Sequence, residues 1–108
     1  MVTQQAALIR VQQFLEEVRQ LGVPLRQAIL FGSFARNEQH EYSDIDVALV
    51  ADNFTGAAFI DSKPFIYSIV KHIDIEPHTF SPAQFTDWNP FVQEIKRTGI
   101  VVGKWEPA

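Results

Sequence analysis

The sequence predicts a mixed α/β (α+β) domain in which a small mixed sheet of about four strands is flanked by helices. Three observations support this fold class. A long amphipathic helical segment lies near the N-terminus, two short apolar runs at residues 27–31 and 43–50 are joined by a polar loop, and helical and strand-like segments alternate along the rest of the chain. The predicted order of elements is α-β-α-β-α-β-α-β.

The first predicted helix covers residues 3–21. Thr3 is a suitable N-cap because its side-chain oxygen can accept a hydrogen bond from a free N–H group of the first turn. Gly22 and Pro24 then end the helix. Apolar residues recur along it at helical spacing: Leu8, Val11, Phe14 or Leu15, Val18 and Leu21.

Two strands are predicted around the polar loop. Residues 27–31 (QAILF) form a short apolar run that ends at Gly32, which is typical of a buried strand. Residues 33–37 are expected to open a short helix or a turn, and residues 37–42 to form the loop. Residues 43–50 alternate with the period of a strand, so Ile45, Val47 and Leu49 are expected on one face and Asp44, Asp46 and Ala48 on the other.

The second half of the chain is predicted to add two more strands. Residues 57–71 contain helical patches around a break at Pro64, and residues 73–80 form the third strand candidate. Pro77 places that strand at a sheet edge or near a strand end, because proline cannot donate a ladder hydrogen bond.

The last predicted helix and strand follow a second capping signal. Asn89 and Pro90 combine an N-cap residue with a proline at the first helical position, and a helix is expected over residues 91–98. Gly99 ends it, and residues 100–102 form a last, short strand.

Composition limits the class of protein. The 108 residues are predicted to form one domain (residues 1–108), and a hydrophobic content of 46% with nine Phe indicates a globular chain. The absence of cysteine excludes disulfides and thiolate chemistry. No apolar run approaches the roughly 20 residues of a membrane span. The net charge of −4 argues against a nucleic-acid partner. We expect a cytoplasmic protein without membrane attachment.

Asp44 and Asp46 are the first candidate ligands for a metal ion. On one face of a strand their Cα atoms would lie roughly 7 Å apart, so that their side chains could converge on one point. Two carboxylates there would repel each other unless a cation lay between them, and oxygen ligands favour Mg²⁺ or Mn²⁺. The alternative is an acidic pair that simply faces solvent.

Gly32 and Ser33 are candidates for anion binding. A strand that ends in Gly-Ser and runs into a helix start presents free backbone N–H groups and a hydroxyl, which suits the phosphates of a nucleotide. The alternative is an ordinary β-turn. The segment lacks the lysine and the longer glycine spacing of a P-loop, so that motif is excluded.

The segment G-S-F-A-R followed by S-D-I-D-V, within residues 32–47, resembles the signature of the polymerase-beta-type nucleotidyltransferase superfamily. It is most similar to that of the minimal nucleotidyltransferases, which are single domains of about this length. Their pattern has a glycine after the arginine, where this chain has Asn37. The departure is mild, because Asn tolerates a positive φ better than other non-glycine residues do.

The resemblance implies roles for individual residues. The residues implied in nucleotide binding are Gly32, Ser33, Arg36 and Ser43. The residues implied in catalysis are Asp44, Asp46 and a third acidic residue on a later strand, which is Asp74 or Glu76. Period 2 cannot choose between the last two, because they share one face of the predicted strand.

Asp74 is preferred as the third metal ligand, beside Asp44 and Asp46, because it lies between two apolar residues as in the more usual family pattern. Glu76 remains the alternative, with a longer reach and a position near the expected strand end. The histidines are interpreted as structural or solvated rather than as ligands: His40, His72 and His78.

The resemblance also implies a function. An enzyme of this family, with Mg²⁺ or Mn²⁺, moves a nucleoside monophosphate from ATP or another nucleoside triphosphate to a hydroxyl acceptor. Single-domain members often pair with a small helical partner protein of the HEPN type, and they act as the antitoxin of the pair. The alternative is a catalytically silent module that neutralises its partner by contact alone. A homo-oligomer is also compatible with the sequence.

Overall fold

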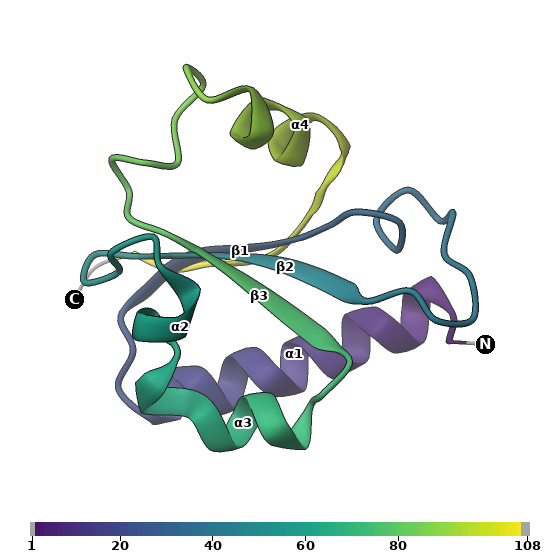
Figure 1. The fold of residues 1–108 in the computed structure, drawn as a ribbon, viewed down its shortest axis with the longest axis horizontal. Coiled ribbons are helices and arrows are strands. Elements are labelled where there is room, and N and C mark those ends of the chain that lie inside the picture. The colour runs from purple at the N-terminus through teal and green to yellow at the C-terminus, as the bar shows by residue number, and fades with distance from the viewer. Residues whose placement is uncertain (1, 107–108) are drawn as a thin grey trace.

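A computed structural model describes residues 2–106 of the chain (Figure 1). The order of the elements matches the predicted order except between the first two strands, which follow each other without a helix between them. The elements are α1 (Gln4–Gln20), β1 (Leu25–Phe31), β2 (Ile45–Ala51), α2 (Ala58–Asp61), the 3-10 helix η1 (Lys63–Phe65), α3 (Ile66–Lys71), β3 (Ile75–Phe80), α4 (Pro90–Thr98) and β4 (Ile100–Lys104).

The four strands form one mixed sheet in the order β3-β2-β1-β4. β1 pairs antiparallel with both β2 and β4, and β2 pairs parallel with β3. A long loop, residues 32–44, joins β1 to β2, while the α2–α3 segment carries the chain from the end of β2 back to the start of β3. The predicted fold class, a small mixed sheet of four strands flanked by helices, is confirmed.

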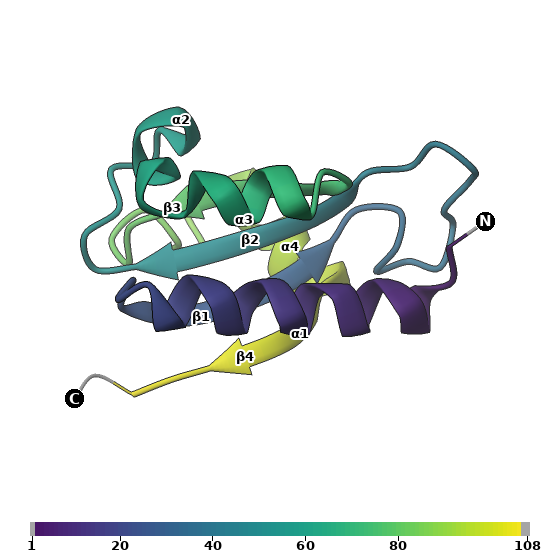
Figure 2. The same cartoon turned by 90° about the horizontal axis from the view of Figure 1, so that it is seen from below.

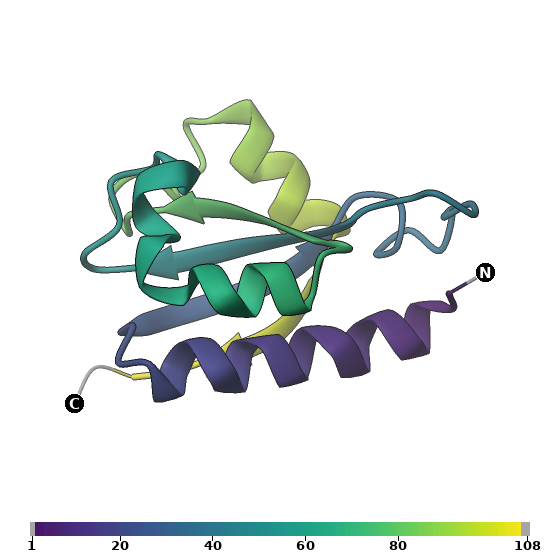
Figure 3. The same cartoon turned by 60° about the horizontal axis from the view of Figure 1, so that its bottom comes forward.

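Helices cover both faces of this sheet. α1 and α3 lie side by side under one face, and α4 packs on the other (Figures 2 and 3). On the α1 face, Leu30, Val47 and Leu49 join the larger core cluster. On the α4 face, Phe31 and Ala48 join a second cluster with residues of α4. Because both faces are covered, β1 and β2 read as nearly continuous apolar runs.

The predicted helix caps are present. The Thr3 side chain accepts a hydrogen bond from the Ala6 N–H at 3.1 Å, and the Asn89 side chain accepts one from the Phe91 N–H at 2.9 Å. Each cap satisfies an N–H group that has no partner inside its helix. The start of α1 and the start of α4 are therefore fixed by local sequence.

Several element bounds differ from the sequence prediction. β2 begins at Ile45 rather than at residue 43, and β3 begins at Ile75 rather than at residue 73. A turn separates α3 from β3, and it is closed by a hydrogen bond from the Ile75 N–H to the His72 carbonyl at 2.9 Å. The strand period therefore does not extend back to Asp74. Residues 33–37 form a turn rather than a helix.

Among the described residues, no helix has both the length and the apolar composition that crossing a bilayer would require.

Candidate active site

The chain turns sharply where β1 ends. Gly32 has a φ of +77°, a region that L-residues with a side chain rarely adopt. The turn is closed by backbone hydrogen bonds from the Arg36 N–H to the Gly32 carbonyl (3.2 Å) and from the Glu38 N–H to the Ser33 carbonyl (2.8 Å). Phe34 is 2% exposed and anchors the turn in the core on the α1 side.

The turn presents unpaired backbone donors. Within residues 2–106, no backbone carbonyl accepts from the N–H groups of Ser33, Phe34 or Ala35. The first turn of α1 supports the loop from the other side, because the Gln4 Nε2 atom donates to the Phe34 carbonyl at 2.9 Å and to the Ala35 carbonyl at 3.2 Å. Successive free N–H groups in a tight turn form a concave site for an anion.

Asp46 connects this turn to the sheet. A Cβ atom on Gly32 would collide with the Asp46 Oδ2 atom, and it would lie 3.3 Å from the Asp46 Cγ atom. Glycine therefore leaves just enough room for the carboxylate against the backbone. The register agrees, since Phe31 pairs with Asp46 across β1 and β2. The Gly-Ser turn therefore lies directly against the Asp46 carboxylate.

Across the parallel pair, Asp46 meets two side chains of β3. Asp46 pairs in register with Glu76, and Ala48 pairs with His78. The His78 Nε2 atom lies 3.2 Å from the Asp46 Oδ1 atom and 3.9 Å from the Glu76 Oε1 atom. Each of the three residues offers a ligand atom within 4.8 Å of the others. This donor set of two carboxylates and an imidazole could hold a divalent cation.

The structure does not bring Asp44 and Asp74 into this cluster. Asp44 lies in the exposed segment just before β2. Asp74 lies in the turn before β3, and its carboxylate forms an ion pair with Arg10 of α1. The Asp74 backbone carbonyl accepts a hydrogen bond from the N–H of Ile45, the residue after Asp44, at 2.8 Å. Of the two candidates for the third acid, Glu76 is the one beside Asp46.

The other predicted site residues lie along the loop. The exposed Arg36 side chain pairs with Glu38, with 3.4 Å between Nε and Oε2. Ser43 closes the last turn of the loop, where its Oγ atom accepts from the His40 N–H at 2.9 Å. Asn37, which replaces the family glycine, has a φ of +56°. The positive φ expected at this position is therefore confirmed.

Sequence reasoning missed the position of His78. It was interpreted as structural, yet its ring lies against Asp46 and is 29% exposed on its side chain. A signal was available, because Glu76 and His78 are two residues apart in a strand and must share one face. The pattern could not show that Asp46 of β2 lies on that same face.

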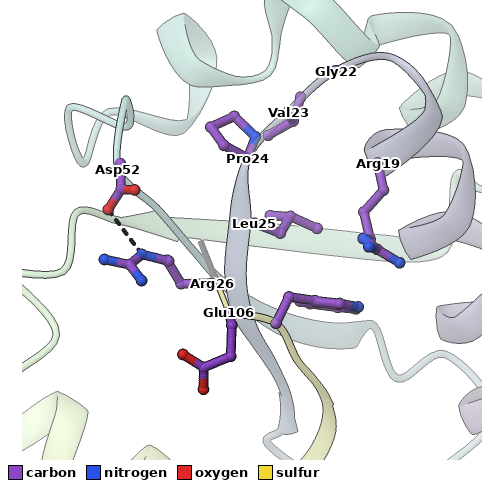
Figure 4. Close-up of a pocket in the computed structure, with 9 residues that line it drawn as sticks. Arg19, Gly22, Val23, Pro24, Leu25, Arg26, Asp52 and Glu106 are labelled. Atoms are coloured by element: carbon purple, nitrogen blue, oxygen red, sulfur yellow. Dashed lines mark hydrogen bonds and ion pairs between the residues drawn. The ribbon is translucent and has the colours of Figure 1, made fainter. Parts of the chain in front are cut away.

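Two hollows in the described part of the chain lie away from this site. One, of about 380 Å³, lies at the opposite end of β1, between the end of α1 and the β4 terminus (Figure 4). Trp105 lines it, with its ring 4.8 Å from the Arg19 guanidinium carbon. The ion pair between Arg26 and Asp52 also lines it. The second, of about 410 Å³, is lined by Asp87, Gln93, Lys96 and Arg97.

A turn with free N–H groups that lies directly against a carboxylate cluster is the arrangement expected of a site that handles phosphate groups with the help of a cation. The chain belongs to the nucleotidyltransferase domain family, whose family model matches residues 11–101. The resemblance inferred from residues 32–47 is thereby confirmed, and the class of enzyme is a nucleotidyltransferase.

Solved structures share the fold. A protein of Sulfolobus solfataricus, described as a candidate nucleotidyltransferase, matches with a TM-score of 0.64 and 20% identity, over 94% of this chain and 83% of that one. A mutant of the toxin–antitoxin complex MntA–HpeT matches with a TM-score of 0.62 and 17% identity, over 88% and 73%. A toxin–antitoxin complex with AMP-PNP matches with a TM-score of 0.61 and 19% identity, over 92% and 74%. No curated protein matches the sequence.

Proposed function

We propose that this domain transfers a nucleoside monophosphate from ATP or another nucleoside triphosphate to a hydroxyl acceptor, in the presence of Mg²⁺ or Mn²⁺. The observation that carries the proposal is the contact between Gly32 and Asp46, which places an anion-binding turn against a carboxylate. A phosphate bound at the turn would lie beside the group best suited to recruit its counter-ion. The donor proposed here agrees with the AMP-PNP present in one structural neighbour.

The chain's residues take distinct roles in this proposal. The N–H groups of the turn at Ser33–Ala35 bind phosphate oxygens, with Arg36 as a nearby positive charge and Ser43 as a support for the loop. The acceptor hydroxyl attacks the α-phosphorus, the bond from that phosphorus to the bridging oxygen breaks, and pyrophosphate leaves. The proton of the hydroxyl passes to a carboxylate of the site. A divalent cation would neutralise the charge that develops on the phosphate oxygens.

We assign the third carboxylate to Glu76. It is the register partner of Asp46 and reaches within 3.9 Å of His78, whose ring contacts Asp46. Asp74 pairs with Arg10 of α1, and an arginine partner reduces the availability of a carboxylate for a cation. Asp44, which is exposed beside the start of β2, remains a second proposed ligand that a bound triphosphate–metal complex could reach.

We also propose that the domain acts in the cytoplasm as the antitoxin-type component of a pair, with a small helical HEPN-type protein as its partner. Two of the structural neighbours are toxin–antitoxin complexes, which supports this assignment. A homo-oligomer is also compatible with this proposal.

The test is nucleotide transfer with a labelled triphosphate, with the co-purifying partner as acceptor, in wild type and in Asp46→Asn. We expect transfer only in wild type, with Mg²⁺ or Mn²⁺ present. If wild-type protein binds its partner and neutralises it but transfers no nucleotide and binds no triphosphate, the chain is a silent binding module. In that case the variant Asp46→Asn would neutralise the partner as well as wild type does.

A further inference from the structure

His78 occupies a position that the proposed transfer reaction does not by itself require. It follows Glu76 by two residues on β3, and its ring lies on the same side of the sheet as Asp46. The ring also packs edge-on against Phe31, with 4.9 Å between ring centroids, and lies 6.2 Å from the Phe91 ring of α4. These aromatic contacts hold the imidazole with its Nε2 atom turned toward the two carboxylates.

The two distances from the His78 nitrogen to the carboxylates fall in the range of a ligand shell, and all three donors lie within 4.8 Å of one another. Donor atoms that share one cation at about 2.1 Å lie roughly 3 to 4.2 Å from one another. The His78 Nε2 atom lies 3.2 Å from the Asp46 Oδ1 atom and 3.9 Å from the Glu76 Oε1 atom. A single cation can therefore be in bonding range of all three donors with small side-chain adjustments.

The two carboxylate oxygens of Asp46 lie next to different neighbours. Its Oδ1 atom faces His78, while its Oδ2 atom lies against Gly32 at the base of the anion-binding turn. A cation next to Oδ1 would thus be separated from the turn by a single carboxylate. A cation held there would remain close to phosphate oxygens bound at the turn.

We propose that His78 is a metal ligand, together with Asp46 and Glu76, and that its nitrogen makes the site prefer Mn²⁺ over Mg²⁺. Mg²⁺ takes oxygen ligands almost exclusively, whereas the first-row transition ions also accept imidazole nitrogen. The inference rests on the proposed metal-dependent function, because it concerns the same carboxylates. It adds a ligand and a metal preference that three carboxylates alone would not produce.

The experiment measures metal binding directly. Calorimetric titration of the purified protein with Mn²⁺ and with Mg²⁺, with and without a non-hydrolysable triphosphate, gives the ratio of the two affinities. Pulsed EPR of bound Mn²⁺ detects a directly coordinated nitrogen. The variants are His78→Gln, which offers an oxygen in place of the nitrogen, and His40→Gln as the control on an exposed loop histidine.

We expect wild type and His40→Gln to bind Mn²⁺ on the order of 10-fold more tightly, relative to Mg²⁺, than His78→Gln does. The pulsed-EPR signal of a nitrogen bound to Mn²⁺ should be present in wild type and in the control, and it should be lost in His78→Gln. Circular dichroism and thermal unfolding would show that the variant remains folded.

Two results would overturn the inference. One is an unchanged Mn²⁺/Mg²⁺ ratio and an unchanged EPR signal in folded His78→Gln, and the other is a wild type that binds neither ion. In the first case metal-dependent transfer can still occur, so the proposed function survives. Conversely, a nitrogen-coordinated Mn²⁺ in a protein that transfers no nucleotide would support the inference and contradict the proposed function.

Discussion

The absence of a side chain at Gly32 allows the loop to approach Asp46 of the sheet closely. The residue has a φ of +77°, and any Cβ atom there would collide with the Asp46 carboxylate. Gly22 is a natural comparison, because its φ of +87° is equally unusual for an L-residue, yet a Cβ there would meet no atom within 4 Å. The two glycines therefore separate backbone strain from contact within the site.

We predict that Gly22→Ala lowers the free energy of unfolding by about 1 kcal/mol, because it places a side chain at a positive φ. Gly32→Ala should lower it at least as much, because its Cβ atom must also displace the Asp46 carboxylate. Only Gly32→Ala should also weaken binding of a triphosphate and of its metal ion, because only there is the Asp46 carboxylate displaced. Denaturant unfolding and calorimetric titration measure the two effects. Equal ligand affinity in the two variants would mean that the Gly32 turn is not the phosphate site.

The identity of the third carboxylate, Asp74 or Glu76, also depends on the position of a single side chain. Sequence reasoning preferred Asp74, but the structure places the Asp74 carboxylate on Arg10 and the Glu76 carboxylate beside Asp46 and His78. We now predict that Glu76→Gln lowers the transfer rate by about 100-fold or more, since it removes charge where the transition state needs it.

Asp74→Asn should have a much smaller effect on transfer. The ion pair of Asp74 with Arg10 is partly exposed, so its loss should change the free energy of unfolding by about 1 kcal/mol or less. Transfer rates and unfolding curves of both variants decide the matter. The opposite ranking of the transfer rates would return the catalytic role to Asp74.

At the scale of the elements, one polar cluster fastens α3 to α1. The Glu17 carboxylate accepts hydrogen bonds from Ser68 (3.1 Å) and Lys71 (3.1 Å), and its Oε2 atom lies 2.9 Å from the His72 Nε2 atom. His72 also packs edge-on against Phe14 in the core. The hydrogen bond to His72, followed by that to Lys71, lowers the pKa of Glu17 from 4.5 to about 2.

This lowered pKa predicts a pH dependence of stability. The folded state holds Glu17 ionised more strongly than the unfolded chain does, so the stabilisation is complete above the unfolded pKa of about 4.5 and is lost as the pH falls toward 2. We predict that Glu17→Gln lowers the free energy of unfolding by about 1–2 kcal/mol at neutral pH. The difference in the free energy of unfolding between wild type and variant should become smaller as the pH falls below 4.5.

Denaturant unfolding between pH 2 and pH 7 provides the measurement. Glu16→Gln is the matched control, since Glu16 is the preceding residue of α1 and its only side-chain hydrogen bond among the described residues is a 3.5 Å contact with Gln20. Its curve should run parallel to that of wild type. If the free energy of unfolding of Glu17→Gln differs from that of wild type by the same amount down to pH 2, the ionised carboxylate does not stabilise the fold.

At the scale of the whole molecule, exposed apolar side chains gather on the segment from α2 to the start of β3. This segment lies on the outside of the α1 face (Figures 2 and 3). Its exposed large hydrophobic residues are Phe59, Ile60, Ile66, Tyr67, Val70 and Ile73. Several exposed large apolar side chains on one segment of a small domain are typical of a protein interface. It is the surface that we expect the proposed helical partner to cover.

We predict that Tyr67→Asp, at a residue 87% exposed, reduces the amount of partner that co-purifies by about 10-fold or more, because a charge would be buried in the interface. The protein should stay folded and keep its affinity for the triphosphate, since Tyr67 lies outside the site. Tyr42→Asp, also 85% exposed but on the loop, serves as the control. Undiminished partner recovery with Tyr67→Asp would place the interface elsewhere.

Much of the fold follows from local patterns. Thr3 and Asn89 cap their helices as predicted, because a cap needs only the hydrogen bonds of its own turn. The alternation in β2 correctly separated Val47 and Leu49 from Ala48, because side chains of a strand alternate between its faces whatever packs on them. The family resemblance likewise depended on a contiguous motif, and Gly32 and Asp46 of that motif do lie together.

The rest depended on the parallel pairing of β2 with β3. Whether Asp74 or Glu76 approaches Asp46 is decided by where the turn after α3 ends and by the register that then places Glu76 opposite Asp46. His78 entered the site for the same reason. A one-residue slip in the pairing of β3 with β2 would turn every β3 side chain to the opposite face, and this register is a contact between segments that are distant in the sequence. Local sequence therefore determined the elements and the motif, and tertiary pairing decided which side chains complete the site.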